Sequence, residues 1–185
     1  MRATELSRAF QSTLEVLEQV KPQDLAAPTP CASWDVRALV NHFVGTARWW
    51  AAMADGAEPP AEADYTAGDL VAAYHESIGI GNAAFAADGI MDRPVRLPFG
   101  EFPGAVVLQM AALDQFTHGW DLARAIGQPT DLDPVLAGEL LGHARLAITD
   151  AFRGPDPAAP FGPVMTAPAG SGPADQLAAF LGRRV

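Results

Sequence analysis

The sequence predicts an all-α protein folded as a four-helix bundle. Four long stretches place apolar residues at helical spacing, and the segments between them are rich in proline and glycine. Of the 185 residues, 49% are hydrophobic and 18% are charged. A chain of this length buries about 70% of the surface that it exposes when unfolded, so it can form a core without disulfides. We expect a single domain over residues 1–185, built as a bundle with extra pieces.

Two helices are predicted in the first third of the chain. The first is amphipathic and is expected to stop before Pro22. A connection with three prolines covers residues 22–32, after which Ser33 is expected to cap a second helix that includes Trp34 and runs to about Asp55, with Gly56 at its end. The apolar residues that predict the first helix are Leu6, Phe10, Leu14, Leu17 and Val20.

A polar loop over residues 56–65 separates the second helix from a third. Thr66, with Asp69 three residues later, is expected to cap this third helix, which continues to about Asp88. Residues 92–103 carry three prolines and two short alternations of polar and apolar residues, which favour a small hairpin or an extended loop.

The remaining helices are predicted by proline and cap residues. Pro103 suits the first turn of a fourth helix that ends near Gly127. The pair Asp133-Pro134 opens a fifth helix that runs to about Arg153. Residues 154–173 are expected to be irregular, and a short extra helix over Ala174 to Leu181 closes the chain.

Charge and composition exclude several classes of function. The formal net charge is −10, from 22 acidic and 12 basic residues, whereas nucleic-acid binding needs a basic surface. The same charge argues against an anionic membrane surface as a partner. No apolar run approaches the roughly 20 residues of a membrane span, and the start of the chain does not resemble a signal peptide. We therefore expect a cytoplasmic protein, in which the single Cys31 rules out a disulfide framework.

A carboxylate and two imidazoles form the candidate functional site. Asp114 and His118 are four residues apart and lie on one apolar face of the fourth helix, while His42 lies on the apolar face of the second. Two imidazoles and one carboxylate are the donors of an open, three-ligand site for a divalent metal. Two simpler interpretations stay open: His42 as a core histidine bonded to a backbone carbonyl, and Asp114 with His118 as a buried ion pair.

Two further residues have a chemical and a structural interpretation. Asp121 follows His118 by three residues and could orient it as a supporting carboxylate, or it could pair with Arg124 or Arg48 at the surface. Cys31 precedes a helix, where the pKa of a thiol is lowered, yet a single cysteine beside proline is more often a small packed apolar residue.

Three stretches resemble one known family. TPCASWDVRALVNHFVG at 29–45, LDQFTHGWDLARAIG at 113–127 and DQLAAFLGRR at 175–184 occur in the order seen in the DinB/YfiT-like superfamily. Within that superfamily, the chain is most similar to the N-terminal domain of mycothiol-dependent maleylpyruvate isomerases and to related metal-binding proteins. The motifs TPCxxW and DxxxHxWDLA are specific for the family, whereas they say little about the reaction.

The resemblance implies a down-up-up-down four-helix bundle that holds a divalent metal, zinc or nickel. Carried over by motif, the metal ligands are His42, Asp114 and His118, although the isomerases have glutamate at the position of Asp114. In such enzymes the thiol of mycothiol takes the place of metal-bound water and adds to a small electrophile. Addition followed by elimination isomerises a double bond, and addition alone gives S-conjugation, the reaction of an S-transferase.

Other functions stay open at this point. The resembled isomerases carry a second domain, whereas this sequence ends at Val185, so an S-transferase is expected before a true maleylpyruvate isomerase. A metal-activated water could instead hydrolyse a small ester or amide, with Asp121 or Glu101 as the only candidate bases. A non-catalytic bundle that binds metal or a small ligand is a third class, and the sequence leaves a homodimer open.

Overall fold

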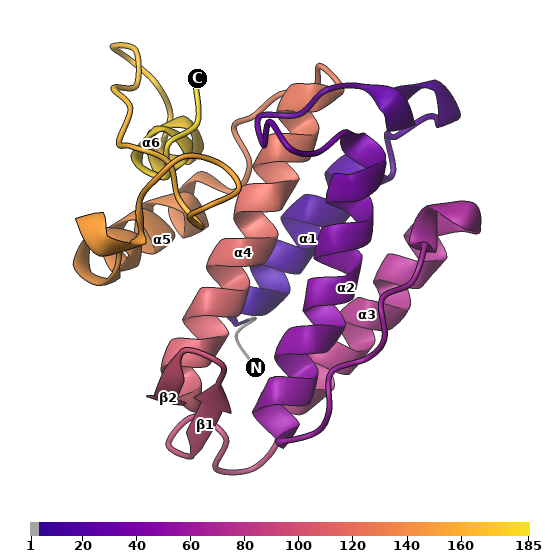
Figure 1. Cartoon of the computed structure of the whole chain (residues 1–185), viewed down its shortest axis with the longest axis vertical. Helices are drawn as coiled ribbons and strands as arrows, with labels where there is room; N and C mark the ends of the chain where they lie inside the picture. The colour runs from indigo at the N-terminus through magenta and orange to yellow at the C-terminus, as the bar shows by residue number, and fades with distance from the viewer. Residues whose placement is uncertain (1–3) are drawn as a thin grey trace.

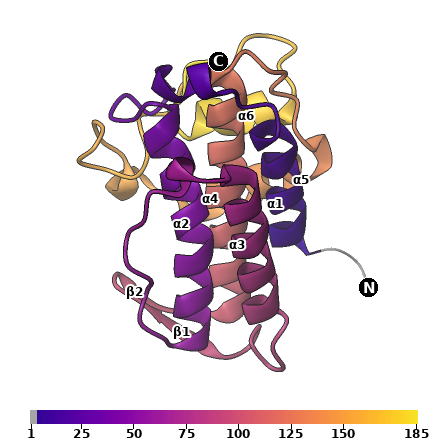
Figure 2. The same ribbon diagram turned by 90° about the vertical axis from the view of Figure 1, so that its right-hand side faces the viewer.

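Four helices lie side by side along the long axis of the molecule (Figure 1). The structure is a computed structural model that describes residues 4–185. Helix α1 packs against α4 and α3, and α2 packs against α3 and α4, an arrangement also visible after a quarter turn (Figure 2). The four helices are α1 (Glu5–Leu17), α2 (Val36–Asp55), α3 (Leu70–Phe85) and α4 (Gly104–Ala125).

The predicted hairpin and extra helices are present around these four. Strands β1 (Pro94–Leu97) and β2 (Gly100–Pro103) pair antiparallel, with Val95 opposite Phe102. Helices α5 (Pro134–Ala147) and α6 (Pro173–Phe180) pack on each other and on α4. Within residues 4–185, no helix combines the length and the apolar character that a membrane crossing requires. Three short 3₁₀ turns cover Pro22–Ala26, Tyr65–Ala67 and Asp150–Phe152.

The start of α2 differs from the prediction that Ser33 caps it. The cap is Asp35, whose carboxylate accepts a hydrogen bond from the backbone N–H of Ala38 at 2.8 Å. Ser33 instead donates its backbone N–H and its hydroxyl to Asp156, at 2.8 and 2.7 Å. Trp34 therefore precedes the helix, contrary to the prediction, whereas the end at Asp55 with a left-handed Gly56 is confirmed.

Other helix boundaries were also misplaced by a few residues. Asp69, not Thr66, caps α3 by accepting from the N–H of Ala72 at 3.0 Å, and Pro103 precedes the first turn of α4. Serine, threonine and aspartate are all good caps, so the sequence alone does not choose between neighbouring candidates. Helices α1, α3 and α5 end earlier than expected, at Leu17, Phe85 and Ala147. Val20 and Ile148 lie beyond the last turns of α1 and α5 but still pack on the core, so apolar character alone did not mark the ends of these helices.

The segment between α2 and α3 returns along α2 before α3 begins. Asn41, near the start of α2, binds Asp64 through its amide N–H at 3.0 Å and accepts from the backbone of Tyr65 at 2.8 Å. The starts of α2 and α3 therefore lie at the same end, as a down-up-up-down connection requires. Residues of this returning segment cover one side of α2 (Figure 2).

Helices α1 and α4 pack tightly against each other at Gly119. A Cβ atom at this position would lie 2.3 Å from the hydroxyl oxygen of Thr13 and 3.1 Å from the Thr13 Cα. The Thr13 hydroxyl also donates to the carbonyl of Gln115 at 2.8 Å, which fixes α1 against the turn of α4 that carries the candidate site. Only glycine allows this contact without a shift of the backbone.

We predict that Gly119→Ala destabilises the protein by about 1–3 kcal/mol, the usual cost of extra volume in a packed contact. The matched control is Gly142→Ala on α5, where a Cβ would meet nothing within 4 Å and where alanine favours the helix. Urea denaturation followed by circular dichroism measures both free energies of unfolding. Equal stability of the two variants would contradict the close packing at Gly119.

Candidate metal centre

The three residues predicted as metal ligands lie together between α2 and α4. The Oδ1 atom of Asp114 is 3.4 Å from Nδ1 of His118 and 3.9 Å from Nε2 of His42. One donor atom from each of the three residues lies within 4.8 Å of the other two. The face shared by Asp114 and His118 on α4 thus meets the face of α2 that carries His42, as the helical spacing predicted.

The two oxygens of Asp114 have different surroundings. Oδ2 accepts hydrogen bonds from the Thr46 hydroxyl at 2.9 Å, the Gln115 amide at 3.1 Å and the Trp50 indole N–H at 3.3 Å. Oδ1 instead faces the two imidazoles. Three donors therefore fix the orientation of the carboxylate through one oxygen and leave the other directed at the centre of the site.

His118 is a buried imidazole without a hydrogen-bond partner on Nδ1 among the residues that the structure describes. The residue is only 8% exposed. Burial lowers the pKa of His118 and outweighs the attraction of Asp114, so the imidazole is neutral at pH 7. A buried nitrogen of this kind needs a partner, and a metal ion would provide one.

The pKa of Asp114 reflects opposing effects. Burial raises it, but the imidazoles of His118 and His42 and the hydrogen bond from Thr46 outweigh burial and hold it below the usual range. Asp114 is therefore a carboxylate at neutral pH, next to a neutral imidazole. Because His118 is neutral, a simple buried ion pair explains the site less well than a cation bound between the three side chains.

These surroundings fit a divalent metal. The donors are one carboxylate oxygen and two imidazole nitrogens, the set from which open zinc and nickel sites are built. The carboxylate is ionised and at least one imidazole is neutral, as metal ligation requires. The assignment of His42, Asp114 and His118 as ligands stays a prediction that direct metal analysis tests.

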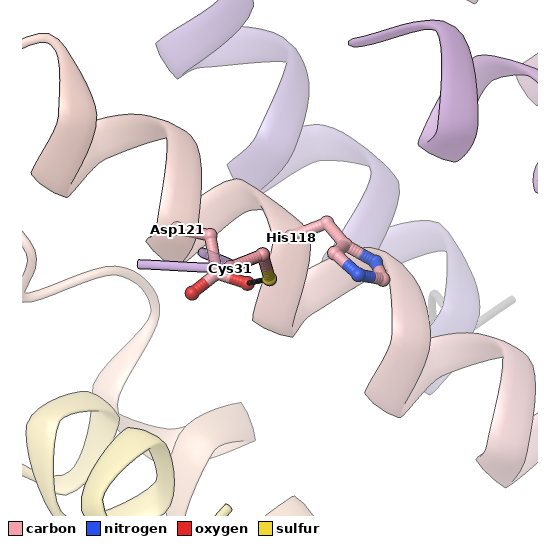
Figure 3. Close-up of side chains that lie close together, drawn as sticks. All are labelled: Cys31, His118 and Asp121. Carbon is pink, nitrogen blue, oxygen red and sulfur yellow. Dashed lines mark hydrogen bonds between the residues drawn. The ribbon is translucent and has the colours of Figure 1, made fainter. Parts of the chain in front are cut away.

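A second cluster lies one turn further along α4 (Figure 3). Asp121 is fully buried, and its carboxylate accepts from Arg183 at 3.0 and 3.2 Å and from the Cys31 thiol at 3.4 Å. Arg183 thereby ties the C-terminal residues to α4. The charged partner of Asp121 is thus Arg183. The predicted pairing of Asp121 with Arg124 or Arg48 at the surface is wrong. Arg48 instead forms an ion pair with Glu76.

Cys31, His118 and Asp121 also bring three metal-binding atoms within 4.8 Å of one another. In this set, however, the Arg183 guanidinium already neutralises Asp121 and lies 3.6 Å from the Cys31 sulfur. Burial, together with the charge of Asp121, raises the pKa of Cys31 to about 12, so the thiol stays protonated. The Arg183 guanidinium therefore already supplies the positive charge in this cluster. His42, Asp114 and His118 form the better metal site.

The structure also shows residues that the sequence analysis missed. Thr46 and Trp50 follow His42 by four and eight residues, so the helical period could have placed them beside the site. No pattern in the sequence predicts that Arg183 pairs with Asp121, because the two residues are 62 positions apart. Trp34 was predicted as an apolar helix residue, but its ring lies against His42 with a centroid distance of 4.4 Å.

A cavity of about 700 Å³ opens beside His42. Its walls come from the side of α2 that carries His42, Thr46 and Trp49 and from residues 60–65 of the returning segment. Part of the polar loop predicted over residues 56–65 thus forms one wall of this cavity. Cys31 and Arg183 instead border a separate and smaller cavity of about 130 Å³.

The sequence matches one known domain family over nearly the whole chain. Residues 6–185 match the mycothiol maleylpyruvate isomerase N-terminal domain. The chain belongs to this family. Two relatives are uncharacterized proteins of Mycobacterium tuberculosis, from strains CDC 1551 / Oshkosh and ATCC 25618 / H37Rv, each 43% identical over 182 residues. The matched residues make up 96% of this chain and 95% of each relative. No solved structure matches the chain.

We predict that Arg183→Met destabilises this family member by about 3 kcal/mol, because the variant leaves the carboxylate of Asp121 buried without its cation. The matched control is Arg96→Met, which removes an exposed arginine 3.7 Å from Glu101 and should change stability by less than about 1 kcal/mol. Chemical denaturation measures both variants. A cost for Arg183→Met no larger than that of the control would contradict the importance of the buried pair.

Proposed function

We propose that this protein is a divalent-metal-dependent enzyme that uses mycothiol, a small-molecule thiol, in an S-transferase or isomerase reaction on a small electrophile. The observation that carries the proposal is the arrangement of His42, Asp114 and His118: Oδ1 of Asp114 faces both imidazoles, and Nδ1 of His118 is buried with no hydrogen-bond partner among residues 4–185. A cavity of about 700 Å³ adjoins His42 and Thr46, so it offers a small molecule a place next to one of the proposed ligands. Membership of the isomerase-domain family supports the thiol chemistry.

Each residue of the site has a defined task in this proposal. His42, Asp114 and His118 would hold zinc or nickel, and Thr46, Trp50 and Gln115 keep the Asp114 carboxylate in place. When bound, a divalent metal lowers the pKa of a thiol far below its usual value of about 8.5, which gives thiolate at neutral pH. The thiolate would add to one carbon of an activated C=C bond as its π bond breaks and the electron pair moves onto the neighbouring atoms of the substrate. Protonation there, which returns the proton lost by the thiol, gives a thioether, whereas expulsion of the thiolate after rotation about the C–C bond re-forms the double bond as the other isomer.

The nucleophile of this reaction comes from the small-molecule thiol and not from Cys31. Burial raises the pKa of Cys31 to about 12, and its sulfur is engaged with Asp121 and Arg183. A protonated, engaged thiol is a weak nucleophile. Cys31 also borders a different cavity from the one beside His42.

Neither of the two bases that the sequence suggested for a hydrolase, Asp121 and Glu101, is free beside the site. Asp121 is committed to Arg183, and Glu101 lies on strand β2, where its nearest charged partner is Arg96 at 3.7 Å. Activation of a water would require a proton acceptor within hydrogen-bond reach. The cavity beside His42, in turn, favours an enzyme over a metal that serves only the fold.

We predict that His42→Ala, Asp114→Ala and His118→Ala each weaken zinc binding by more than about a hundredfold. Loss of a residue that only supports a metal ligand costs about 10- to 100-fold, so a larger loss identifies a ligand. His75→Ala is the control, because His75 is an exposed histidine on α3. Metal content after zinc loading and dialysis, together with circular dichroism, measures binding and fold. Unchanged zinc content in the three variants would contradict the site, and loss of the fold with the metal would indicate a structural ion.

We further predict that the zinc- or nickel-loaded protein binds mycothiol in calorimetric titrations and accelerates its conjugation to a model electrophile. Cys31→Ser should retain both properties, whereas His42→Ala should lose both, because the proposed nucleophile belongs to the added thiol. No heat of binding and no conjugation with the loaded protein would refute the thiol-dependent function. Turnover of esters or amides without thiol would favour the hydrolase instead.

A further inference from the structure

We propose that the cavity beside His42 selects uncharged or cationic substrates that carry a ring and excludes dicarboxylates, including maleylpyruvate. This inference rests on the proposed function, since it assigns the cavity to the electrophile of that reaction. At about 700 Å³, the cavity has the size of a typical small-molecule site. Because the cavity lies next to His42, a candidate metal ligand, the residues that line it would determine which substrates can approach that ligand.

Three aromatic side chains provide surfaces for a ring. Trp34, Trp49 and Tyr65 line the cavity, and all three are half-buried, so their rings are in part available for contact. The ring of Trp34 lies 4.4 Å from that of His42, between centroids, so one aromatic surface adjoins the candidate metal centre. Aromatic faces bind other rings and cations, and the negative face of an aromatic ring is unfavourable for carboxylates.

The fixed charges that line the cavity are negative. Glu62 and Asp64 are on its wall, and none of the lining residues in the described part of the chain is lysine or arginine. Asp64 is held in place by the Asn41 amide at 3.0 Å and by the Thr66 hydroxyl and backbone N–H. The hydrogen bonds from Thr66 and Asn41 lower its pKa, so Asp64 remains charged at pH 7.

Arg48 and Arg37 do not line the cavity, and each is paired with other groups of the protein, although Arg37 is close enough to help lower the pKa of Asp64. Arg48 donates to Ser77 and Glu76 and lies over the ring of Tyr65, at 5.4 Å from its centroid. Arg37 donates to the hydroxyl of Thr66 at 2.6 Å. Recognition of a dicarboxylate depends on free cations, ideally an arginine that binds both oxygens. This cavity instead presents two carboxylates, which repel an anionic substrate.

Three matched ligands test the charge preference: 4-fluorobenzamide, 4-fluorobenzylamine and 4-fluorobenzoate. Their binding to the full chain is followed by fluorine NMR at pH 7.5 and low salt, after a chelator has removed metal that a carboxylate could ligate. We expect the amide and the amine to bind at least about fivefold more tightly than the benzoate, the effect of one unit charge about 4 Å away in water. Added salt should reduce the difference.

Glu62→Lys should strengthen benzoate binding by about fivefold or more and leave benzamide binding unchanged. Glu58→Lys is the matched control, because Glu58 is exposed in the same segment but does not line the cavity. Trp49→Ala should weaken the binding of all three ligands, because Trp49 lines the cavity. This result would show that the ligands bind there. The proposal is overturned if benzoate binds as tightly as benzamide, if none of the ligands binds, or if the two lysine variants behave alike.

These measurements need neither metal nor thiol. A protein that shows the charge preference but fails to bind zinc or mycothiol would keep the cavity assignment and lose the proposed function. A protein that conjugates mycothiol but binds benzoate and benzamide equally would keep the function and lose this specificity.

Discussion

The hydrogen bonds to one oxygen of Asp114 are the interaction on which the rest of the site depends. Thr46, Trp50 and Gln115 all donate to Oδ2, so Oδ1 is directed at the imidazoles of His42 and His118. These donors come from both helices that form the site, which means that the packing of α2 on α4 and the orientation of the carboxylate are established together. Without these hydrogen bonds, the Asp114 carboxylate could rotate so that Oδ1 no longer faces the place where a metal ion would bind.

Two further contacts hold α4 in the register that this site needs. Gly119 lets α1 approach next to His118, and the ion pair of Asp121 with Arg183 fastens the C-terminal residues one turn further along α4. The same ion pair occupies the second set of donor atoms, that of Cys31 and Asp121, with a guanidinium. One helix thus carries two neighbouring clusters with different tasks: one is suited to a metal, and the other fixes the chain.

The sequence predicted the helices and the candidate ligands better than their surroundings. Asp114 and His118 were found because a spacing of four residues places them on one helical face, and His42 because it lies on the apolar face of its own helix. The family motifs pointed to the same three residues. The caps were misassigned where serine or threonine stands close to aspartate, since both can accept the same hydrogen bond. Arg183 and the charge of the cavity wall were beyond prediction, because each depends on segments that only the folded chain brings together.

X-ray absorption spectroscopy of the zinc-loaded protein distinguishes the proposed ligands from the neighbouring donor set, because it reports the elements bound to the metal. The two overlapping donor sets differ by a single atom type: His42, Asp114 and His118 offer nitrogen and oxygen, whereas the other set includes the sulfur of Cys31. We predict a first shell of nitrogen and oxygen only, to which one sulfur at about 2.3 Å is added when mycothiol is supplied. A sulfur ligand in the absence of added thiol would instead place the metal beside Cys31 and rule out the set of His42, Asp114 and His118 as its ligands.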